Sequence, residues 1–396
     1  MKRIDVFMPP LSTYGVLHHF TEKMHEAFLR IGIQSRLLEA KRNDPGPFIK
    51  ALFEDKPDCS LSFNGLLPDD KGRFFCDMVN IPHVACLVDS PNSYLSLTES
   101  PTTIITCVDQ ASVDFFKGTG FSRVLFMPHG VEPTLAPDPS GNKEYDVVML
   151  SSCIDYESIR SSWKKKYSAA LCKAMEEAAE NALENINKPY YQAFVEALNK
   201  QVQRQSGIDP QTIDFVQILD DIEMYIRGKD RVELVKSIKD AKIDIFGSAD
   251  GSAGWKKYLK DKRNATIHDP IPFEQALAIM KQSKIVLNSS PWISYGGHER
   301  IFAGLACSAL VITNENAYLK QEFKDGESIV FYHHGGWEKA NHRVNEYLEN
   351  SSKREGVAKK GREVVMARHT WDHRAKQLIA DLSPILEKLK ISSTRA

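Results

Sequence analysis

The feature that most constrains the fold is a regular alternation of short apolar strands with helical segments along most of the chain. Residues 4–8 form an apolar run that ends at a pair of prolines, and the segment after it repeats apolar side chains at helical spacing. Further strands are predicted at 35–38, 59–63, 83–88, 103–108 and 123–127. Strands that alternate with helices in this way are typical of a doubly wound parallel sheet.

A second series of strands begins after a polar, proline-containing stretch at 137–143, which has the composition of a linker. Its strands are predicted at 145–150, 242–246, 266–268, 284–287, 309–313 and 328–331. The long gap after the first of these strands is rich in alanine and charged residues, which predicts a helical insertion at 156–240. The sequence therefore predicts an α/β protein with two Rossmann-like domains, residues 1–136 and 144–370.

Composition argues against several classes of partner without excluding local sites for them. The 51 basic and 52 acidic side chains nearly cancel, so no overall charge favours nucleic acid or an anionic membrane. The seven cysteines are scattered and never form a Cys-x-x-Cys pair, which is typical of reduced core residues rather than of a disulfide or zinc framework. No apolar stretch approaches the ~20 residues of a membrane-spanning helix. We therefore expect a cytoplasmic protein that binds no nucleic acid and has no transmembrane segment.

The most informative segment is 284–313, where a buried strand, a glycine pair, an ionisable triplet and a helix follow one another. Gly296 and Gly297 allow backbone N–H groups to approach a phosphate closely, and the helix that begins near His298 directs its partial positive charge to the same place. Glu299 can accept hydrogen bonds from ribose or sugar hydroxyls, and Arg300 can bind a phosphate oxygen. We interpret the segment as a nucleotide-diphosphate cradle; a plain helix start with a charged first turn is the alternative.

The C-terminal third of the chain resembles the CgeB-like glycosyltransferases, a branch of the GT-B enzymes. The resemblance covers roughly 242–376 and depends on four segments, 244–247, 287–291, 296–313 and 318–326. It implies a GT-B-like fold in which two Rossmann-like domains face a cleft, the acceptor lies in the first domain and the donor in the second. It also implies that the C-terminal helix, residues 371–396, crosses back to the first domain, with Trp371 in a packing role.

The resemblance implies roles for several residues in donor binding. It places the donor diphosphate at the loop formed by Gly296, Gly297, His298, Glu299 and Arg300. The following helix departs from the wider GT-B pattern, because Ala303 replaces a glutamate that grips ribose in retaining members, and Ser308 replaces a glycine.

Three further donor-site candidates lie at the ends of other strands. The basic glycine loop of related enzymes is missing after the first C-terminal strand, so Arg160 is the nearest cation for a leaving diphosphate. Gly247 begins a second glycine loop, which is either near the donor or only a flexible turn. His129 follows the last N-terminal strand, at a turn that related enzymes place beside the donor; a hinge role is the alternative.

Glycosyl transfer with inversion also needs a base for the acceptor hydroxyl. Asp89 is the first candidate because it ends a buried strand just before a turn, although a turn-forming aspartate is an equal alternative. His18 and His19 follow the first strand, and either can serve as a base near neutral pH or pack under the loop. We expect no metal site: His333 and His334 are adjacent in a predicted strand and point to opposite faces.

These observations predict a glycosyltransferase that uses a nucleotide-diphosphate sugar as donor and requires no other cofactor. A sugar-nucleotide epimerase or hydrolase on the same fold is one alternative. A catalytically silent protein that binds a nucleotide sugar or a glycan is the other. The acceptor, the stereochemistry and the oligomeric state stay open, with a protein, a glycan, a lipid-linked glycan and a small molecule all possible as acceptors.

Overall fold

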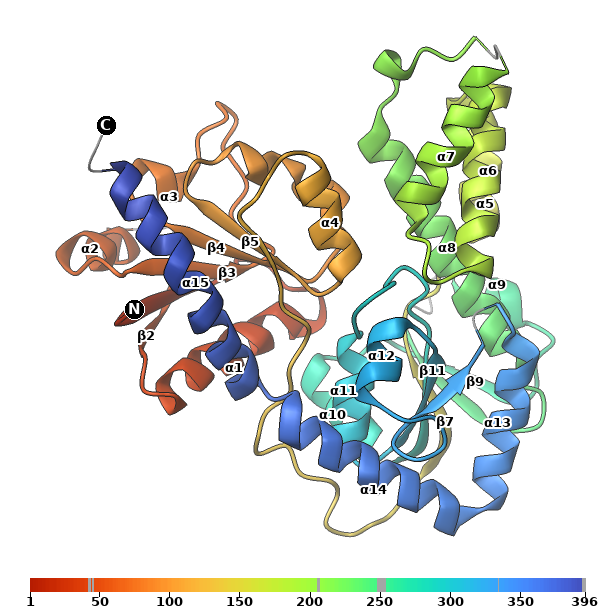
Figure 1. Ribbon diagram of the computed structural model, residues 1–396. Coiled ribbons are helices and arrows are strands. Elements are labelled where there is room, and N and C mark those ends of the chain that lie inside the picture. The colour runs from red at the N-terminus through yellow and green to blue at the C-terminus, as the bar shows by residue number, and fades with distance from the viewer. Residues whose placement is uncertain (42–43, 45, 205–206, 248–253, 334, 394–396) are drawn as a thin grey trace. The chain divides into compact units, whose positions relative to one another are not determined.

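The computed structural model describes residues 1–41, 44, 46–204, 207–247, 254–333 and 335–393 (Figure 1). The chain divides into two compact units: Met1–Thr134 together with the chain from Ala367 onward, and Leu135–Met366. Each unit contains one six-stranded sheet, and every pairing between its strands is parallel. The predicted α/β fold with two Rossmann-like sheets is therefore confirmed.

The sheet of the first unit has the strand order β2-β1-β3-β4-β5-β6. Its strands are β1 (Arg3–Met8), β2 (Gln34–Glu39), β3 (Cys59–Phe63), β4 (His83–Leu87), β5 (Thr103–Cys107) and β6 (Val124–Phe126). Every residue of β3, β4 and β5 is buried, as expected for central strands covered on both faces. The edge strand β2 has no fully buried residue. The predicted N-terminal strands are all present, with ends that differ by at most one residue.

Helices flank this sheet on the connections between the strands. They are η1 (Thr13–Gly15), α1 (Val16–Arg30), α2 (Gly46–Glu54), α3 (Phe75–Met78), η2 (Pro91–Glu99), α4 (Gln110–Gly118) and α15 (Trp371–Ser393). The last helix, α15, packs along α1 (Figure 1). The start of this helix is anchored to the segment that follows β6, because Val131 N donates to His369 O at 2.9 Å and Trp371 N donates to Val131 O at 2.8 Å. The ring of Trp371 is buried against Phe20.

The sheet of the second unit has the order β12-β11-β10-β7-β8-β9. Its strands are β7 (Tyr145–Leu150), β8 (Ile243–Phe246), β9 (Ala265–His268), β10 (Ser283–Asn288), β11 (Leu310–Asn314) and β12 (Val330–Tyr332). The helices outside the insertion are α9 (Trp255–Leu259), α10 (Phe273–Lys281), α11 (Glu299–Ala306), α12 (Ala317–Glu322), α13 (Trp337–Glu349) and α14 (Ser351–Arg368). Strands β7 and β10 are neighbours at the centre, so the loops after both reach the same edge of the sheet.

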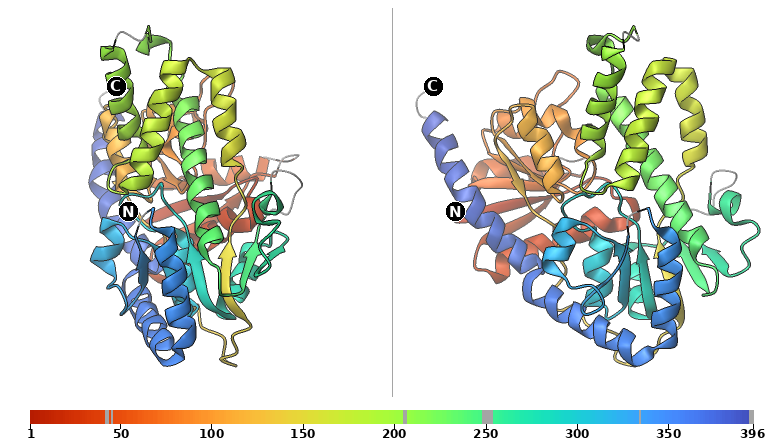
Figure 2. Two further views of the ribbon diagram at one scale, coloured as in Figure 1. Left: turned by 90° about the vertical axis from the view of Figure 1, so that its right-hand side faces the viewer. Right: turned by 45° about the vertical axis from the view of Figure 1, so that its right-hand side comes forward.

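The predicted helical insertion is confirmed between β7 and β8. It consists of α5 (Tyr156–Lys166), α6 (Ala169–Glu184), α7 (Tyr190–Gln203), η3 (Pro210–Thr212) and α8 (Phe215–Ser237). Helices α5, α6 and α8 begin at side-chain caps from Asp155, Ser168 and Asp214, each of which accepts a hydrogen bond from a backbone N–H of the first turn. Figures 1 and 2 show α6 and α7 projecting from the second unit as a pair, while the long helix α8 leads back to the sheet. The last helix of the insertion, α8, therefore lies beside the core of this unit.

Candidate functional site

The glycine pair predicted from the sequence lies in the loop between β10 and α11. Both glycines are buried, and a Cβ added to Gly297 would lie 2.7 Å from the ring of Phe302. This glycine is therefore required by the close packing of the loop against its own helix. The backbone of the loop is fixed from the start of α12, because Asn316, which caps that helix, donates through Nδ2 to Ile293 O and to Gly296 O, each at 3.0 Å.

The ionisable triplet forms a connected group at the start of α11. His298 Nδ1 lies 2.5 Å from Glu299 Oε2, and His298 Nε2 lies 2.7 Å from Arg300 Nη2. When Nδ1 carries the proton, it donates to the carboxylate and Nε2 accepts from the guanidinium; when Nδ1 is unprotonated, it caps α11 by accepting from Arg300 N, 3.4 Å away. Arg300 is buried and its Nη1 donates to Leu150 O, at the end of β7, at 2.5 Å.

Two further arginines, both from α8, approach Arg300. Arg231 is only 4% exposed; its Nη1 donates to Ser152 O at 2.5 Å, and its Nε has no hydrogen-bond partner among the residues described. Arg227 Nη1 donates to Glu223 Oε1 at 3.0 Å. Arg227 and Arg231 are four residues apart, so they lie on one face of α8. We call Arg227, Arg231 and Arg300 the arginine cluster.

The charges of the arginine cluster act on one another. Burial lowers the pKa of the Arg231 guanidinium well below its usual value, and the neighbouring charges of Arg227 and Arg300 lower it further. Burial also lowers the pKa of Arg300, against the opposing effect of Glu299. Arg227 and Arg300 each have an ion-pair partner, but none of the ion pairs in the described part of the chain includes Arg231. A buried guanidinium without a counter-ion is stabilised by a bound anion.

Next to the arginine cluster, Asp230 forms the centre of a buried network of hydrogen bonds. Asp230 is fully buried and accepts hydrogen bonds from Ser289 Oγ at 2.5 Å and from Trp337 Nε1 at 2.7 Å. Its neighbour in the sequence is Arg231, whose charge it partly balances. The network connects α8, the end of β10 and α13, and it holds α8 in a fixed position relative to the edge of the sheet.

The candidate base Asp89 lies in the other unit, after β4. Its side chain is exposed, and its Oδ2 accepts a hydrogen bond from Asn64 Nδ2 at 2.7 Å. Asn64 has a φ of 60° and accepts a hydrogen bond from Val88 N at 3.1 Å through its own Oδ1. An amide held from both sides in this way orients the carboxylate of Asp89 at the carboxyl edge of the sheet.

The two candidate histidines have different surroundings. His18 Nε2 lies 2.9 Å from Pro9 O and anchors the loop after β1. His19 is buried, and its Nε2 lies 2.5 Å from Glu132 Oε1. Contact with His19 lowers the pKa of the Glu132 carboxyl, although burial opposes the shift as the largest single effect. Of the two, His19 has a carboxylate that orients its ring.

The other predicted donor residues are placed as follows. Arg160 lies on α5, and its guanidinium donates to Glu176 Oε1 at 3.1 and 3.0 Å. A Cβ added to Gly247 would lie 2.1 Å from Ser151 O, so this glycine allows two loops of the second unit to pass each other. His129, in the first unit, is buried and packs on Phe20.

Two segments noted in the sequence lie partly outside the described residues. The second glycine loop includes residues 248–253, and the histidine pair includes residue 334; neither is described. In the described part of the chain, no group of three or more His, Cys, Asp or Glu side chains has a geometry suited to a metal ion. His333 Nδ1 lies 2.7 Å from Glu315 Oε1.

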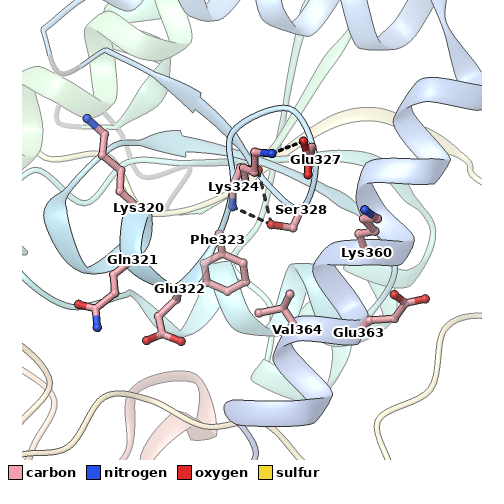
Figure 3. Close-up of a pocket in the computed structure, with 10 residues that line it drawn as sticks. All are labelled: Lys320, Gln321, Glu322, Phe323, Lys324, Glu327, Ser328, Lys360, Glu363 and Val364. Carbon is pink, nitrogen blue, oxygen red and sulfur yellow. Dashed lines mark hydrogen bonds and ion pairs between the residues drawn. The ribbon is translucent and has the colours of Figure 1, made fainter.

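A surface hollow of the second unit does not include the arginine cluster. Figure 3 shows that it lies between α12, the turn after it and α14. It is lined by Lys320, Gln321, Glu322, Phe323, Lys324, Glu327, Ser328, Lys360, Glu363 and Val364. Lysines and glutamates occur in equal numbers, so this hollow has no excess charge with which to select an ion.

Sequence reasoning did not assign Arg227 and Arg231 to the site. A usable signal was present, since two arginines four residues apart share one face of a helix. What the sequence could not show is that this face is buried beside Arg300.

Part of the chain is similar to a known protein family. Residues 229–380, which contain Arg231 and the whole loop before α11, match a family described as glycosyl transferase-like. No curated protein sequence matches the chain. No helix among the described residues is both long and apolar enough to cross a membrane.

Three solved structures illustrate the similarity in fold. HepE from Anabaena in complex with UDP-glucose has a TM-score of 0.52 and 11% identity, over 97% of this chain and 100% of that chain. Sucrose-phosphate synthase from Thermosynechococcus elongatus has a TM-score of 0.55 and 11% identity, over 98% of this chain and 100% of that one. A glycosyltransferase from Rickettsia africae has a TM-score of 0.54 and 10% identity, over 98% of both chains. Residues 229–380 therefore match the glycosyl transferase-like family, and the chain as a whole has the GT-B fold of these solved structures.

Proposed function

We propose that the protein transfers a sugar from a nucleotide-diphosphate donor and that the arginine cluster holds the donor diphosphate. The observation that supports this proposal most strongly is Arg231, a buried guanidinium with no ion-pair partner among the described residues, beside two further arginines. Three guanidinium groups suit a ligand with several phosphate oxygens, because each presents a planar fork of donors to such oxygens.

The position of the cluster also favours a phosphorylated ligand. Arg300 and Arg231 bind the backbone at Leu150 and Ser152, immediately after β7. Ligands of open α/β sheets bind at this carboxyl edge. The first turn of α11 adds backbone N–H groups and the positive end of the helix dipole. The glycine loop before it, with His298 and Glu299, would then contact the phosphates and the hydroxyls of the donor.

In the reaction, the departing diphosphate gains negative charge, which the cluster would stabilise without further reorganisation. We assign this role to Arg231 in preference to Arg160, whose guanidinium is already bound to Glu176. The acceptor would bind the first unit, with Asp89 as the base if the reaction inverts and His18 or His19 as the alternatives. No cofactor other than the donor is part of this proposal.

The nucleotide is proposed by analogy with one relative. The solved structure of HepE contains UDP-glucose, so a uridine diphosphate sugar is the first donor to test. We also propose that the chain belongs to the CgeB-like branch and acts in the cytoplasm. The first of these rests on the segment 296–313, and the second on the seven scattered cysteines, which never form a Cys-x-x-Cys pair in the sequence.

The test is a thermal-shift screen of the purified protein with UDP, GDP, dTDP, ADP and CMP derivatives, followed by product analysis. A ligand at a hundredfold excess over its Kd stabilises the folded state by about 2.7 kcal/mol, which such a screen detects. Sugar transferred to an added acceptor supports the proposal. Hydrolysis or epimerisation in every acceptor mixture would replace transfer with the alternative activity, and the absence of any nucleotide effect would refute the proposal.

A further inference from the structure

The helical insertion contacts the loop before α11 through one continuous chain of side chains. The chain begins on α7, where the hydroxyl of Tyr190 donates to Glu223 Oε2 at 2.9 Å. Tyr190 and Glu223 are both buried. The other oxygen of this carboxylate accepts from Arg227 Nη1, one turn further along α8. One carboxylate thus connects α7 to the arginine cluster.

The chain continues from Arg227 into the glycine loop. The guanidinium of Arg227 lies 4.2 Å from the centroid of the Trp292 ring, a distance typical of a cation–π contact. The Trp292 ring meets the ring of His298 edge to face, with centroids 5.6 Å apart. His298 is the residue that precedes α11 and contacts Arg300. Each step from α7 to α11 is a direct contact.

We propose that the helical insertion sets the geometry of the donor site through this chain, with Glu223 as the positioning residue that orients Arg227 against Trp292. The inference rests on the proposed function for the identity of the ligand. It assigns a role to a segment for which the fold alone gives none. The half-buried Arg227 has four rotatable side-chain bonds and needs such a partner, because an unrestrained guanidinium loses conformational freedom when it binds an anion.

The same helix provides a matched control. Tyr167 donates to Asp221 Oδ2 at 2.8 Å, and this carboxylate also binds Lys166. The Tyr167–Asp221 pair has the same chemistry as the Tyr190–Glu223 pair and lies one helical turn or less away on α8. Asp221 accepts hydrogen bonds from Lys166, Tyr167 and Gln217, which all belong to the insertion and not to the arginine cluster.

The first experiment measures Trp292 directly by fluorine NMR of protein labelled with 5-fluorotryptophan. The chain has five tryptophans, and the Trp292→Phe variant identifies the resonance of interest. Tyr190→Phe is expected to shift the Trp292 resonance. Tyr167→Phe is expected to leave it unchanged and to shift that of Trp163, whose backbone oxygen accepts from Tyr167 N.

The second experiment measures the affinity for inorganic pyrophosphate by calorimetry. Tyr190→Phe is expected to weaken binding about threefold and Arg227→Met about tenfold. Because both changes act on one chain of contacts, the double variant should bind no more weakly than Arg227→Met alone. Tyr167→Phe should bind like the unaltered protein, even if its thermal stability falls as far as that of Tyr190→Phe.

The inference is overturned if Tyr190→Phe and Tyr167→Phe have the same effect on the Trp292 resonance, or if the effects of Tyr190→Phe and Arg227→Met on affinity multiply. Failure of the unaltered protein to bind pyrophosphate or UDP-glucose is a different result. It would refute the proposed function and the link to a donor, while the Trp292 resonance would still show whether the insertion reaches the glycine loop.

Discussion

Replacing Arg231 with methionine tests whether the arginine cluster exists for a ligand or for the fold. Methionine keeps much of the aliphatic volume of arginine and removes its charge. In the free protein the change removes the hydrogen bond from Nη1 to Ser152 O, and it also removes a buried charge that faces Arg227 and Arg300. These two effects on the free energy of unfolding have opposite signs.

The magnitudes decide which effect is larger. A hydrogen bond from a charged group contributes about 1.5–3 kcal/mol. The effective cost of burying an ion is several kcal/mol, and replacing a buried ion pair or triad by apolar residues is often neutral or stabilising by about 1–4 kcal/mol. We therefore expect the free Arg231→Met protein to be as stable as the unaltered one, or more stable by about 1–3 kcal/mol. For a unit of this size, that is a rise in Tm of about 2–4 °C per kcal/mol.

The assay is thermal unfolding with and without pyrophosphate. At a hundredfold excess over Kd, pyrophosphate should stabilise the unaltered protein by about 2.7 kcal/mol, and the variant should lose most of that shift. Arg354→Met is the matched control, since Arg354 is a buried helical arginine that donates to Tyr347 O without any contact to the cluster. It should lower Tm and keep the pyrophosphate shift. The same behaviour from Arg231→Met would show that Arg231 is structural and would refute the reasoning.

Three further predictions concern other parts of the chain. Burial lowers the pKa of His83 and of His369 to about 3. Because these histidines take up protons near pH 6.5 in the unfolded chain, the free energy of unfolding should fall by about 1.4 kcal/mol per pH unit for each of them below that pH. Equal free energies of unfolding by urea at pH 7, 6 and 5 would contradict this prediction. Gly247→Ala places a Cβ 2.1 Å from a backbone oxygen and should destabilise the fold by several kcal/mol. In the control variant Gly356→Ala the added Cβ has nothing within 4 Å, so this change should be neutral or stabilising by about 1 kcal/mol. Equal melting temperatures for the two variants would show that the loops at residue 247 can separate. Asp89→Asn should lower kcat at least a hundredfold, on the order of a lost general base, and leave donor affinity unchanged; an unaltered kcat would move the role of base to one of the candidate histidines.

The sequence by itself determined the architecture, because strands and helices are set by local patterns. The short, largely apolar runs that form β3, β4 and β5 favour buried parallel strands, and the helical spacing after β1 predicts α1. The strand–glycine–helix segment at 284–313 also stands out locally, since its glycines, charged residues and helix start are adjacent in the chain. The position and the helical content of the insertion followed from its composition in the same way.

Only the tertiary structure decided which side chains meet. Arg231 and Arg300 are far apart in the sequence, and they come together because α8 returns from the insertion beside the end of β7. The sequence prediction placed the needed cation at Arg160, the first arginine after β7, while the structure binds that side chain to Glu176. The spacing of residues predicts that a helix forms, but it does not predict how that helix is oriented and positioned against a sheet. Those are fixed by packing across the whole core, and so the donor loop was predictable whereas its arginine partners were not.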